Sequence, residues 1–256
     1  MNRTSMHRSD ALARIGWHIH RQAEAPPTQF QVLGERASGT NLVRKLVEKA
    51  WRIDHTDALG WKHAVPHMVA IPPAMLVIVV QRNALSWARS LYSRPWHSSV
   101  AMQRLSFPEF IRAEWQGVVD RPSQFAALSP ELQAKGAILQ YDRHPITGMP
   151  FETIFAMRNL KAQTWLGLEN RGCNLVFVRL EEVQRDAEPF VMALGAAFGL
   201  APTERGYRPV TRRLGNRYRP TVQNRPAPPA EWSAEDRAFA LSQLDPALEA
   251  AWGYGR

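Results

Sequence analysis

The sequence predicts an α/β fold with a doubly wound, mainly parallel sheet, and three observations support this prediction. Short apolar runs at 30–33, 76–80 and 175–178 alternate with segments of helical periodicity. The run at 76–80 is continuously apolar, as is typical of a parallel strand that is buried on both faces. Hydrophobic residues make up 45% of the 256 residues, which is enough for a large core. We therefore expect a single α/β domain over residues 29–256.

The first predicted elements surround a loop that contains two glycines. Residues 1–28 are expected to form a basic N-terminal arm, because they carry several arginines and end near a Pro-Pro pair. The strand at 30–33 then leads through the loop into a helix over 40–51. A short second strand is expected on or beside Trp61–His63. These elements form the first strand–helix unit of the predicted sheet.

The middle of the chain combines a buried strand with a long segment that lacks strand signals. The strand at 76–80 is followed by a predicted helix over 85–92. Residues 93–150 hold several proline loop signals and one helix near 107–116, so we expect an insertion that covers a substrate. A helix is then predicted over 151–168 from the spacing of its apolar positions.

The last third of the chain repeats the strand–helix order. A strand at 175–178 precedes a predicted helix over 181–198, which ends at Gly199. Residues 219–232 are rich in proline and are expected to be a linker to the C-terminal helix. Ser233 supplies the N-cap of that helix, with acidic residues in its first turn.

The loop after the first strand is the main indication of function. It reads Gly34-Glu-Arg-Ala-Ser-Gly-Thr-Asn41 and lies between a strand and a helix start, a layout that wraps backbone N–H groups around a phosphate. The glycine spacing fits the P-loop pattern GxxxxGKS/T, but Thr40 and Asn41 replace the lysine and the hydroxyl residue. That lysine reaches the β- and γ-phosphates of ATP or GTP. The loop therefore predicts a phosphate binder and disfavours an ordinary NTPase.

A second candidate phosphate site follows the strand at 76–80. Arg82 comes directly after this strand, where open α/β sheets bind ligands, and Ser90 lies eight residues later on the predicted helix. An arginine and a hydroxyl that converge on one point can hold a second, separate phosphate.

These two motifs together resemble the sulfotransferases that use 3′-phosphoadenosine 5′-phosphosulfate. In that family a strand–loop–helix with the tripeptide SGT holds the 5′-phosphosulfate, and Ser38-Gly39-Thr40 matches it here. An Arg…Ser pair eight residues apart holds the 3′-phosphate, and Arg82 and Ser90 match it. The resemblance spans roughly 30–92 and 173–200. It implies a P-loop-like architecture, a bound phosphosulfate donor, and sulfonate transfer to a hydroxyl or amine of an unknown acceptor, such as a carbohydrate.

The resemblance also defines the candidate catalytic residues. Many family members have Lys or Arg directly before SGT, whereas this chain has Ala37, so Arg36 or Lys62 is expected to stabilise the leaving phosphate in its place. The family's segment Lys-x-His-x-Pro is similar to Lys62-His63-Ala-Val-Pro66, although the spacing differs, and it implies that His63 is the general base. His97 is the second candidate for the base.

The remaining candidates extend the predicted site. Ala37 and Asn41 complete the donor-binding loop with Ser38, Gly39 and Thr40. The family's basic, glycine-containing C-terminal loop is matched loosely by 212–217. Arg158 and Lys161 lie on a predicted helix, where they could contact the donor or the acceptor, but we expect them to face solvent. No metal is expected.

Composition leaves two other classes open. The net charge of +9 favours anionic partners, and its excess is concentrated between Arg205 and Arg219. A basic nucleic-acid-binding protein would use this cluster, but no known reader motif is present. A P-loop kinase or NTPase is the other alternative. No apolar run is long enough to span a membrane, and no secretory signal is visible, so a soluble cytoplasmic protein is expected.

Overall fold

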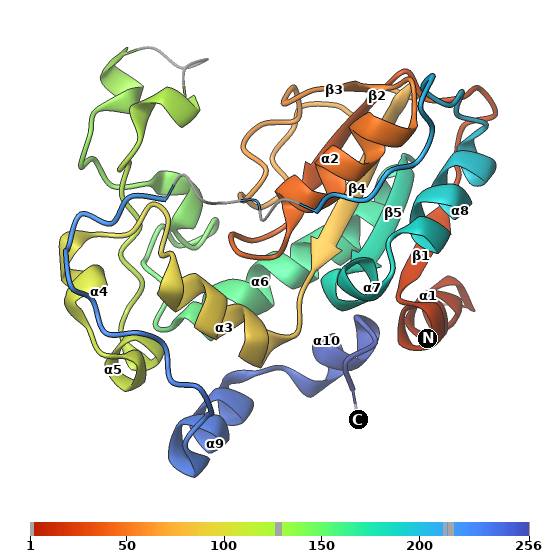
Figure 1. Cartoon of the computed structure of the whole chain (residues 1–256). Helices are drawn as coiled ribbons and strands as arrows, with labels where there is room; N and C mark the ends of the chain where they lie inside the picture. The colour runs from red at the N-terminus through yellow and green to blue at the C-terminus, as the bar shows by residue number, and fades with distance from the viewer. Residues whose placement is uncertain (1–2, 126–129, 212–213, 215–217, 256) are drawn as a thin grey trace. The chain divides into compact units, whose positions relative to one another are not determined.

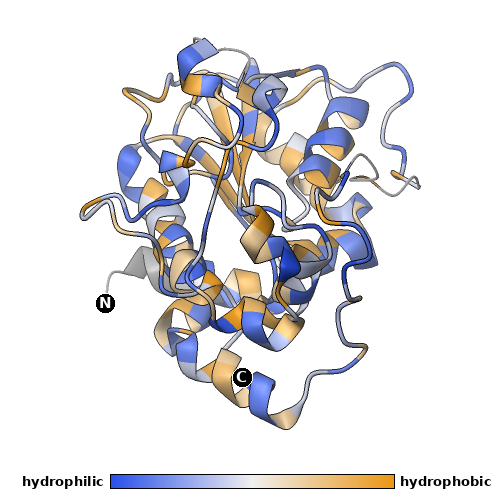
Figure 2. Cartoon of the chain, turned by 90° about the vertical axis from the view of Figure 1, so that its left-hand side faces the viewer, coloured by the Kyte–Doolittle hydropathy of each residue, from blue (hydrophilic) through white to orange (hydrophobic). Residues whose placement is uncertain are grey.

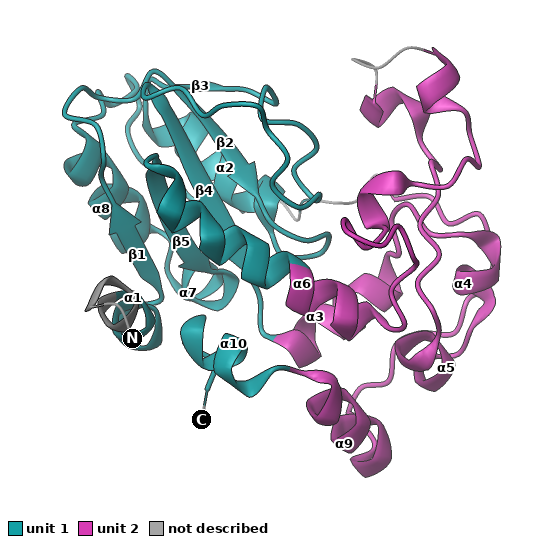
Figure 3. Cartoon of the chain, turned by 180° about the vertical axis from the view of Figure 1, so that it is seen from behind, with its two compact units in different colours: residues 1–83, 161–216, 245–256 teal, residues 84–160, 217–244 magenta. Residues whose placement is uncertain are grey.

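The computed structural model describes residues 3–125, 130–211, 214 and 218–255, with side chains from Arg8 onward. Its internal contacts divide the chain into two compact units (Figure 3). Unit 1 comprises Met1–Asn83, Lys161–Asn216 and Asp245–Arg256, and unit 2 comprises Ala84–Leu160 and Arg217–Leu244. The predicted insertion at 93–150 lies within unit 2. The single domain over 29–256 and the substrate-covering role of the insertion stay predictions.

Unit 1 is built on a mixed five-stranded sheet with the strand order β1-β5-β4-β2-β3 (Figure 1). The strands β2, β3, β4 and β5 are parallel to one another, and β1 pairs antiparallel with β5 at one edge. The predicted α/β class with a mainly parallel sheet is therefore confirmed. The strand bounds are β1 Trp17–His20, β2 Gln29–Leu33, β3 Asp54–His55, β4 Met75–Gln81 and β5 Asn174–Arg179.

Successive strand residues contribute to two apolar cores, one on each face of the sheet. On β4, Leu76, Ile78 and Val80 belong to the first core, whereas Val77 and Val79 belong to the second. Figure 2 shows the central strands coloured almost entirely as hydrophobic. The continuously apolar sequence of this strand is thus explained by burial on both of its faces.

Helices of unit 1 cover both faces of the sheet. The first core includes side chains from α2 (Thr40–Ala50), α7 (Leu180–Arg185) and α8 (Glu188–Phe198). The second core includes side chains from α1 (Arg3–Ile15), α6 (Ile154–Leu166) and α10 (Pro246–Ala251). The short 3₁₀ helix η4 (Gly167–Arg171) extends α6 toward β5.

Unit 2 contains short helices and loops in the part of the chain that the structure describes. Its elements are α3 Ala84–Ser93, α4 Val100–Arg104, α5 Phe107–Arg112, η1 Pro122–Phe125, η2 Pro130–Gln133, η3 Gln140–Asp142, the first turns of α6, and α9 Ala234–Gln243. The proline-rich stretch before α9 is fixed to α4, because the side chain of Gln103 accepts hydrogen bonds from the backbone N–H groups of Thr221 and Val222. Ser233 caps α9 as predicted, with its hydroxyl accepting from the N–H of Asp236 at 3.0 Å.

The predicted basic arm over 1–28 is not an arm in the structure. Residues of this segment form α1 and β1, and Leu12 and Trp17 pack against the rest of unit 1. Arg8 forms an ion pair with Glu169. The sequence gives only a short sign of β1, because the alternation of apolar and polar residues in Trp17–His20 covers four residues, all of them half-buried, and their partner β5 lies far along the chain.

Two further predictions are corrected. Trp61–His63 lies in turns, and the edge strand β3 comes earlier, at Asp54–His55. The helix predicted over 181–198 is divided into α7 and α8, because the chain leaves the helical path at Asp186 and Pro189 begins a new helix. The strands at 30–33, 76–80 and 175–178 and the helices at 40–51 and 85–92 are confirmed to within about two residues.

Within the described residues, no helix has both the length and the apolar composition needed to cross a membrane.

Candidate functional site

The glycine-containing loop lies at a point where ligands commonly bind in α/β sheets. β2 ends at Leu33 and pairs on one side with β3 and on the other with β4, so the chain crosses from one side of β2 to the other. Crevices that bind ligands form outside the carboxyl ends of the strands at such a switch point. The loop at 34–39 follows β2, and Arg82 follows β4, so both lie at this end of the sheet.

Backbone geometry explains why the loop needs its glycines. Gly34 has φ +147°, and a Cβ there would lie 2.4 Å from the carbonyl oxygen of Val80. Gly39 is left-handed with φ +89°, and its Cβ would lie 2.3 Å from a methyl carbon of Leu180. Ala37 also has a positive φ of 63°, which is uncommon for a residue with a Cβ. The loop therefore approaches β4 and α7 closely before α2 begins.

We expect Gly39→Ala to lower the free energy of unfolding by about 3 kcal/mol, because backbone strain and the clash with Leu180 add together. Gly172→Ala is the matched control. Gly172 also has a positive φ, of 62°, but no heavy atom outside its immediate chain neighbours lies within 4 Å of the place that a Cβ would take. The control is expected to cost about 1 kcal/mol. Urea unfolding measures both values, and equal losses would show that the contact with Leu180 contributes nothing.

The loop presents polar groups that no other described residue uses. The N–H groups of Ala37, Gly39, Thr40 and Asn41 donate no hydrogen bond within the described part of the chain. The hydroxyl of Ser38 is buried, with 1% of the residue exposed, and it too has no hydrogen-bond partner there. Unused N–H groups at the start of an eleven-residue helix favour an anion. Ser38, Gly39 and Thr40 are thus able to hold a phosphate.

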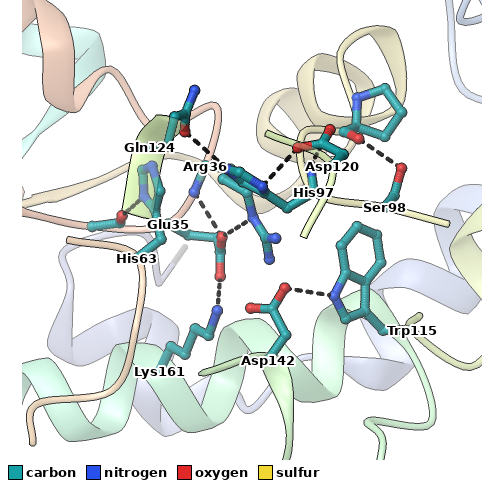
Figure 4. A network of polar contacts seen from close by, with 12 residues as sticks. Glu35, Arg36, His63, His97, Ser98, Trp115, Asp120, Gln124, Asp142 and Lys161 are labelled. Atoms are coloured by element: carbon teal, nitrogen blue, oxygen red, sulfur yellow. Dashed lines mark hydrogen bonds and ion pairs between the residues drawn. The ribbon is translucent and has the colours of Figure 1, made fainter. Parts of the chain in front are cut away.

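A buried charge cluster supports the loop from within unit 1 (Figure 4). One carboxylate oxygen of Glu35 accepts from the backbone N–H of Arg36 at 2.7 Å and from its Nε at 2.8 Å. The other oxygen accepts from Nζ of Lys161 at 2.6 Å. Glu35, Arg36 and Lys161 are exposed by 2% or less. The Arg36 guanidinium also lies 5.5 Å from the ring centre of Trp61.

Lys62 and His63 lie on the segment that packs against the same loop. The carbonyl of Lys62 accepts from the N–H of Gly34 at 3.0 Å, and Nδ1 of His63 lies 2.5 Å from the carbonyl oxygen of Gly34. Since a carbonyl can only accept, Nδ1 carries the proton and Nε2 is the basic nitrogen. Nζ of Lys62 donates to Oδ1 of Asn41 at 2.7 Å, at the start of α2.

Burial and neighbouring cations change the protonation of both side chains. Burial lowers the pKa of His63 well below its ordinary value, and the positive charge of Lys62 lowers it further. His63 is therefore neutral near pH 7, as a general base must be. Burial lowers the pKa of Lys62 to about 8, although the Asp57 carboxylate acts in the opposite direction. Lys62 remains a cation at neutral pH.

Arg82 contacts the loop, whereas Ser90 belongs to the other compact unit. Nη1 of Arg82 donates to the carbonyl oxygen of Ala37 at 3.0 Å, so this arginine is held over the loop. Ser90 lies on α3 in unit 2, whereas Arg82 belongs to unit 1. Each is described within its own unit, and the shared phosphate site stays a prediction.

The second candidate for the base lies in a different environment. His97 belongs to unit 2, where its Nδ1 lies 2.8 Å from Oδ1 of Asp120 and its Nε2 lies 2.9 Å from Oε1 of Gln124. Both ring nitrogens of this buried histidine therefore have a partner. This arrangement suits a structural role better than that of a proton acceptor.

The predicted basic features near the C-terminus are described only in part. Arg205, Arg208 and Arg219 are exposed. Arg212, Arg213 and Arg217, with the rest of the basic loop predicted at 212–217 except Leu214, lie outside the described residues. The role of this cluster stays a prediction.

The prediction that Arg158 and Lys161 face solvent is wrong, since both are fully buried. The signal that reveals this is in the sequence. Lys161 stands four residues after Met157 and four before Trp165, so it lies on the apolar stripe of α6. Sequence reasoning also missed the charge cluster, because the partner of Lys161 is Glu35, which is 126 residues away.

An open groove of about 960 Å³ lies at the other end of the sheet, beside Thr28, Asp54 and His55 at the amino ends of β2 and β3. None of the predicted site residues lines it. Among the described residues, no group of three or more His, Cys, Asp or Glu is arranged to hold a metal ion.

In comparisons with known proteins, no family model, curated protein or solved structure matches the chain.

Proposed function

We propose that the protein is a sulfotransferase, which moves a sulfonate group from 3′-phosphoadenosine 5′-phosphosulfate to a hydroxyl or amine of an acceptor. The observation that carries the proposal is the loop over 34–41. It combines unused N–H groups with nearby cations at the switch point of the sheet, yet it lacks the lysine of an NTPase. The resemblance of its Ser38-Gly39-Thr40 segment to the family's donor loop supports the same assignment, as does the succession of β2, the loop and α2, and we propose that this unit is P-loop-like.

In this proposal the loop holds the 5′-phosphosulfate. The N–H groups of Gly39, Thr40 and Asn41 and the hydroxyl of Ser38 donate to its oxygens. Lys62, whose Nζ contacts Asn41 at the start of α2, takes the role of the cation that the family has in place of Ala37, and Arg36 contributes a second positive charge from within the loop. Arg82 holds the 3′-phosphate of the donor.

The transfer then needs one base and a set of cations. An oxygen of the acceptor forms a bond to sulfur while the bond from sulfur to the bridging oxygen breaks. The bridging oxygen leaves with the electron pair, as part of the 5′-phosphate, and Lys62 and Arg36 stabilise its charge. Nε2 of His63 takes the acceptor's proton, since Nδ1 already donates to Gly34.

Calorimetry with three nucleotides tests the donor assignment. We expect 3′-phosphoadenosine 5′-phosphate to bind more tightly than adenosine 5′-phosphate or ATP, because the site is proposed to hold two separate phosphates. Arg82→Ala is expected to cost about 1.5–3 kcal/mol of binding to the bisphosphate, the scale of a hydrogen bond to a charged group. Equal affinity for adenosine 5′-phosphate with and without the 3′-phosphate would rule the assignment out. Tightest binding of ATP with magnesium would favour the kinase or NTPase class instead.

We expect the affinity for the bisphosphate to fall as the pH rises above about 8. The pKa of Lys62 is lowered to about 8, so this side chain is charged below that value and loses its charge above it. An anion bound beside Lys62 therefore loses part of its electrostatic stabilisation in alkaline solution. Calorimetry between pH 6.5 and 9.5 measures the effect.

Lys62→Arg is the control for this pH dependence, because a guanidinium stays charged over the whole range. The fall in affinity should then disappear. If it persists in Lys62→Arg, another group is responsible for it.

A further inference from the structure

The proposed donor site contains a buried carboxylate among its cations. Glu35 lies in the loop itself and binds Arg36 and Lys161, all three with 2% exposure or less. Stability alone does not explain such a cluster, because well-packed apolar residues of similar volume are often as stabilising as a buried ion pair. A buried negative charge in a loop that attracts anions also opposes the binding of a phosphate. We therefore look for a functional role of the Glu35 carboxylate.

The contacts of Glu35 indicate what it does. Its two oxygens are committed to different partners, one to the N–H and Nε of Arg36 and the other to Nζ of Lys161 (Figure 4). It thus fixes the residue that precedes Ala37 and ties the loop to α6. Lys161 compensates the carboxylate's charge, so the pair adds rigidity to the loop without adding net charge.

We propose that Glu35 is an internal counter-ion that limits how tightly the loop holds an anion, and that Lys161 sets the strength of this limit. The inference rests on the proposed function, since it takes the loop as the site of the donor's 5′-anion. Its consequence concerns the product. A nucleotide bisphosphate that is left among Arg36, Lys62 and Arg82 would leave slowly from a loop without an opposing charge, and product release limits turnover in many enzymes.

The two partners can be tested with changes of opposite sign. Glu35→Gln keeps the size and one acceptor oxygen but removes the negative charge. It is expected to raise the affinity for 3′-phosphoadenosine 5′-phosphate by about tenfold and to slow its release. Lys161→Met keeps the length of the side chain but leaves the charge of Glu35 less compensated, so it should lower the affinity by about tenfold. The double variant should return close to the wild-type value.

Controls with the same charge changes are available on α2. Glu48→Gln and Lys45→Met alter a surface pair, since Lys45 and Glu48 form an i,i+3 contact with a half-exposed lysine. Both are expected to change the affinity by less than about twofold, because water and salt screen exposed charges. Calorimetry and stopped-flow release of the bisphosphate, with inorganic pyrophosphate as a second probe, provide the measurements.

The outcomes separate this inference from the proposed function. A purely structural cluster would lower both affinity and thermal stability in Glu35→Gln and in Lys161→Met, and that result overturns the inference. If Glu35→Gln does not fold, the Lys161→Met variant is sufficient as a test. An unchanged affinity for the bisphosphate in Lys161→Met then overturns the inference. Wild-type protein that binds pyrophosphate without preferring the bisphosphate nucleotide contradicts the proposed donor, while opposite shifts of pyrophosphate affinity would still support the counter-ion. Wild-type protein that binds neither probe contradicts both.

Discussion

Replacing His63 with asparagine is expected to lower turnover by roughly 10²–10⁴-fold, with little change in the affinity for the donor. The side chain of His63 binds the carbonyl oxygen of Gly34 through Nδ1 and keeps Nε2 as its basic nitrogen. An asparagine amide can still donate to this carbonyl, but it cannot accept a proton near pH 7. Transfer of labelled sulfonate from the donor to a panel of carbohydrates and phenols measures the turnover.

His63→Ala is the companion variant, because it removes both the base and the hydrogen bond to Gly34. Its turnover should fall as far as that of the asparagine variant, and its thermal stability should fall further. Full activity in His63→Asn would contradict the assignment of His63 as the base. A loss of donor affinity equal to the loss of turnover would show that His63 only supports the loop.

Replacing Glu35 with leucine is expected to lower the free energy of unfolding by about 3–5 kcal/mol. The substitution leaves Arg36 and Lys161 in a buried position without the carboxylate that both contact. Leucine fills most of the space but accepts no hydrogen bond, so two buried cations lose a strong partner. Urea unfolding at neutral pH measures the loss.

Two further variants show whether this loss comes from charge or from packing. Adding Lys161→Met to Glu35→Leu removes one of the stranded cations and should recover part of the stability. Glu48→Gln removes a carboxylate that contacts Arg44 and Lys45 on the surface of α2, and it should cost less than about 1 kcal/mol. If the double variant is less stable than Glu35→Leu alone, packing rather than charge dominates at this site.

The sequence was sufficient to predict the parts of the fold that depend on local signals. The strand before Gly34, the helix that starts at Thr40 and the buried strand at 76–80 all agree with the structure, because apolar periodicity and glycine positions determine them. The resemblance assigned Lys62 and His63 to the site without predicting their contacts, and the structure adds the hydrogen bonds that connect both residues to Gly34.

The features that sequence reasoning missed depend on contacts between distant residues. A charged side chain on a helix is usually solvated, so solvent exposure is the expectation for Lys161 even on the apolar stripe of α6, and the sequence does not show that Glu35 is its partner. The strand β1 likewise exists because β5 offers it an edge, 155 residues or more along the chain. Periodicity carries no information about such pairs.

The pairing of β1 with β5 also has a consequence for the order of folding. Trp17–His20 leaves the ribosome well before Asn174–Arg179, yet β1 has no other strand to pair with in the sheet. The strand β1 therefore cannot pair until β5 has been synthesised. The parallel strands β2, β4 and β5 can assemble before β1 covers the outer edge of β5. Until then, the outer edge of β5 presents unpaired backbone groups that another chain could bind. The pairing of β1 with β5 therefore protects this edge of the sheet from pairing with another chain.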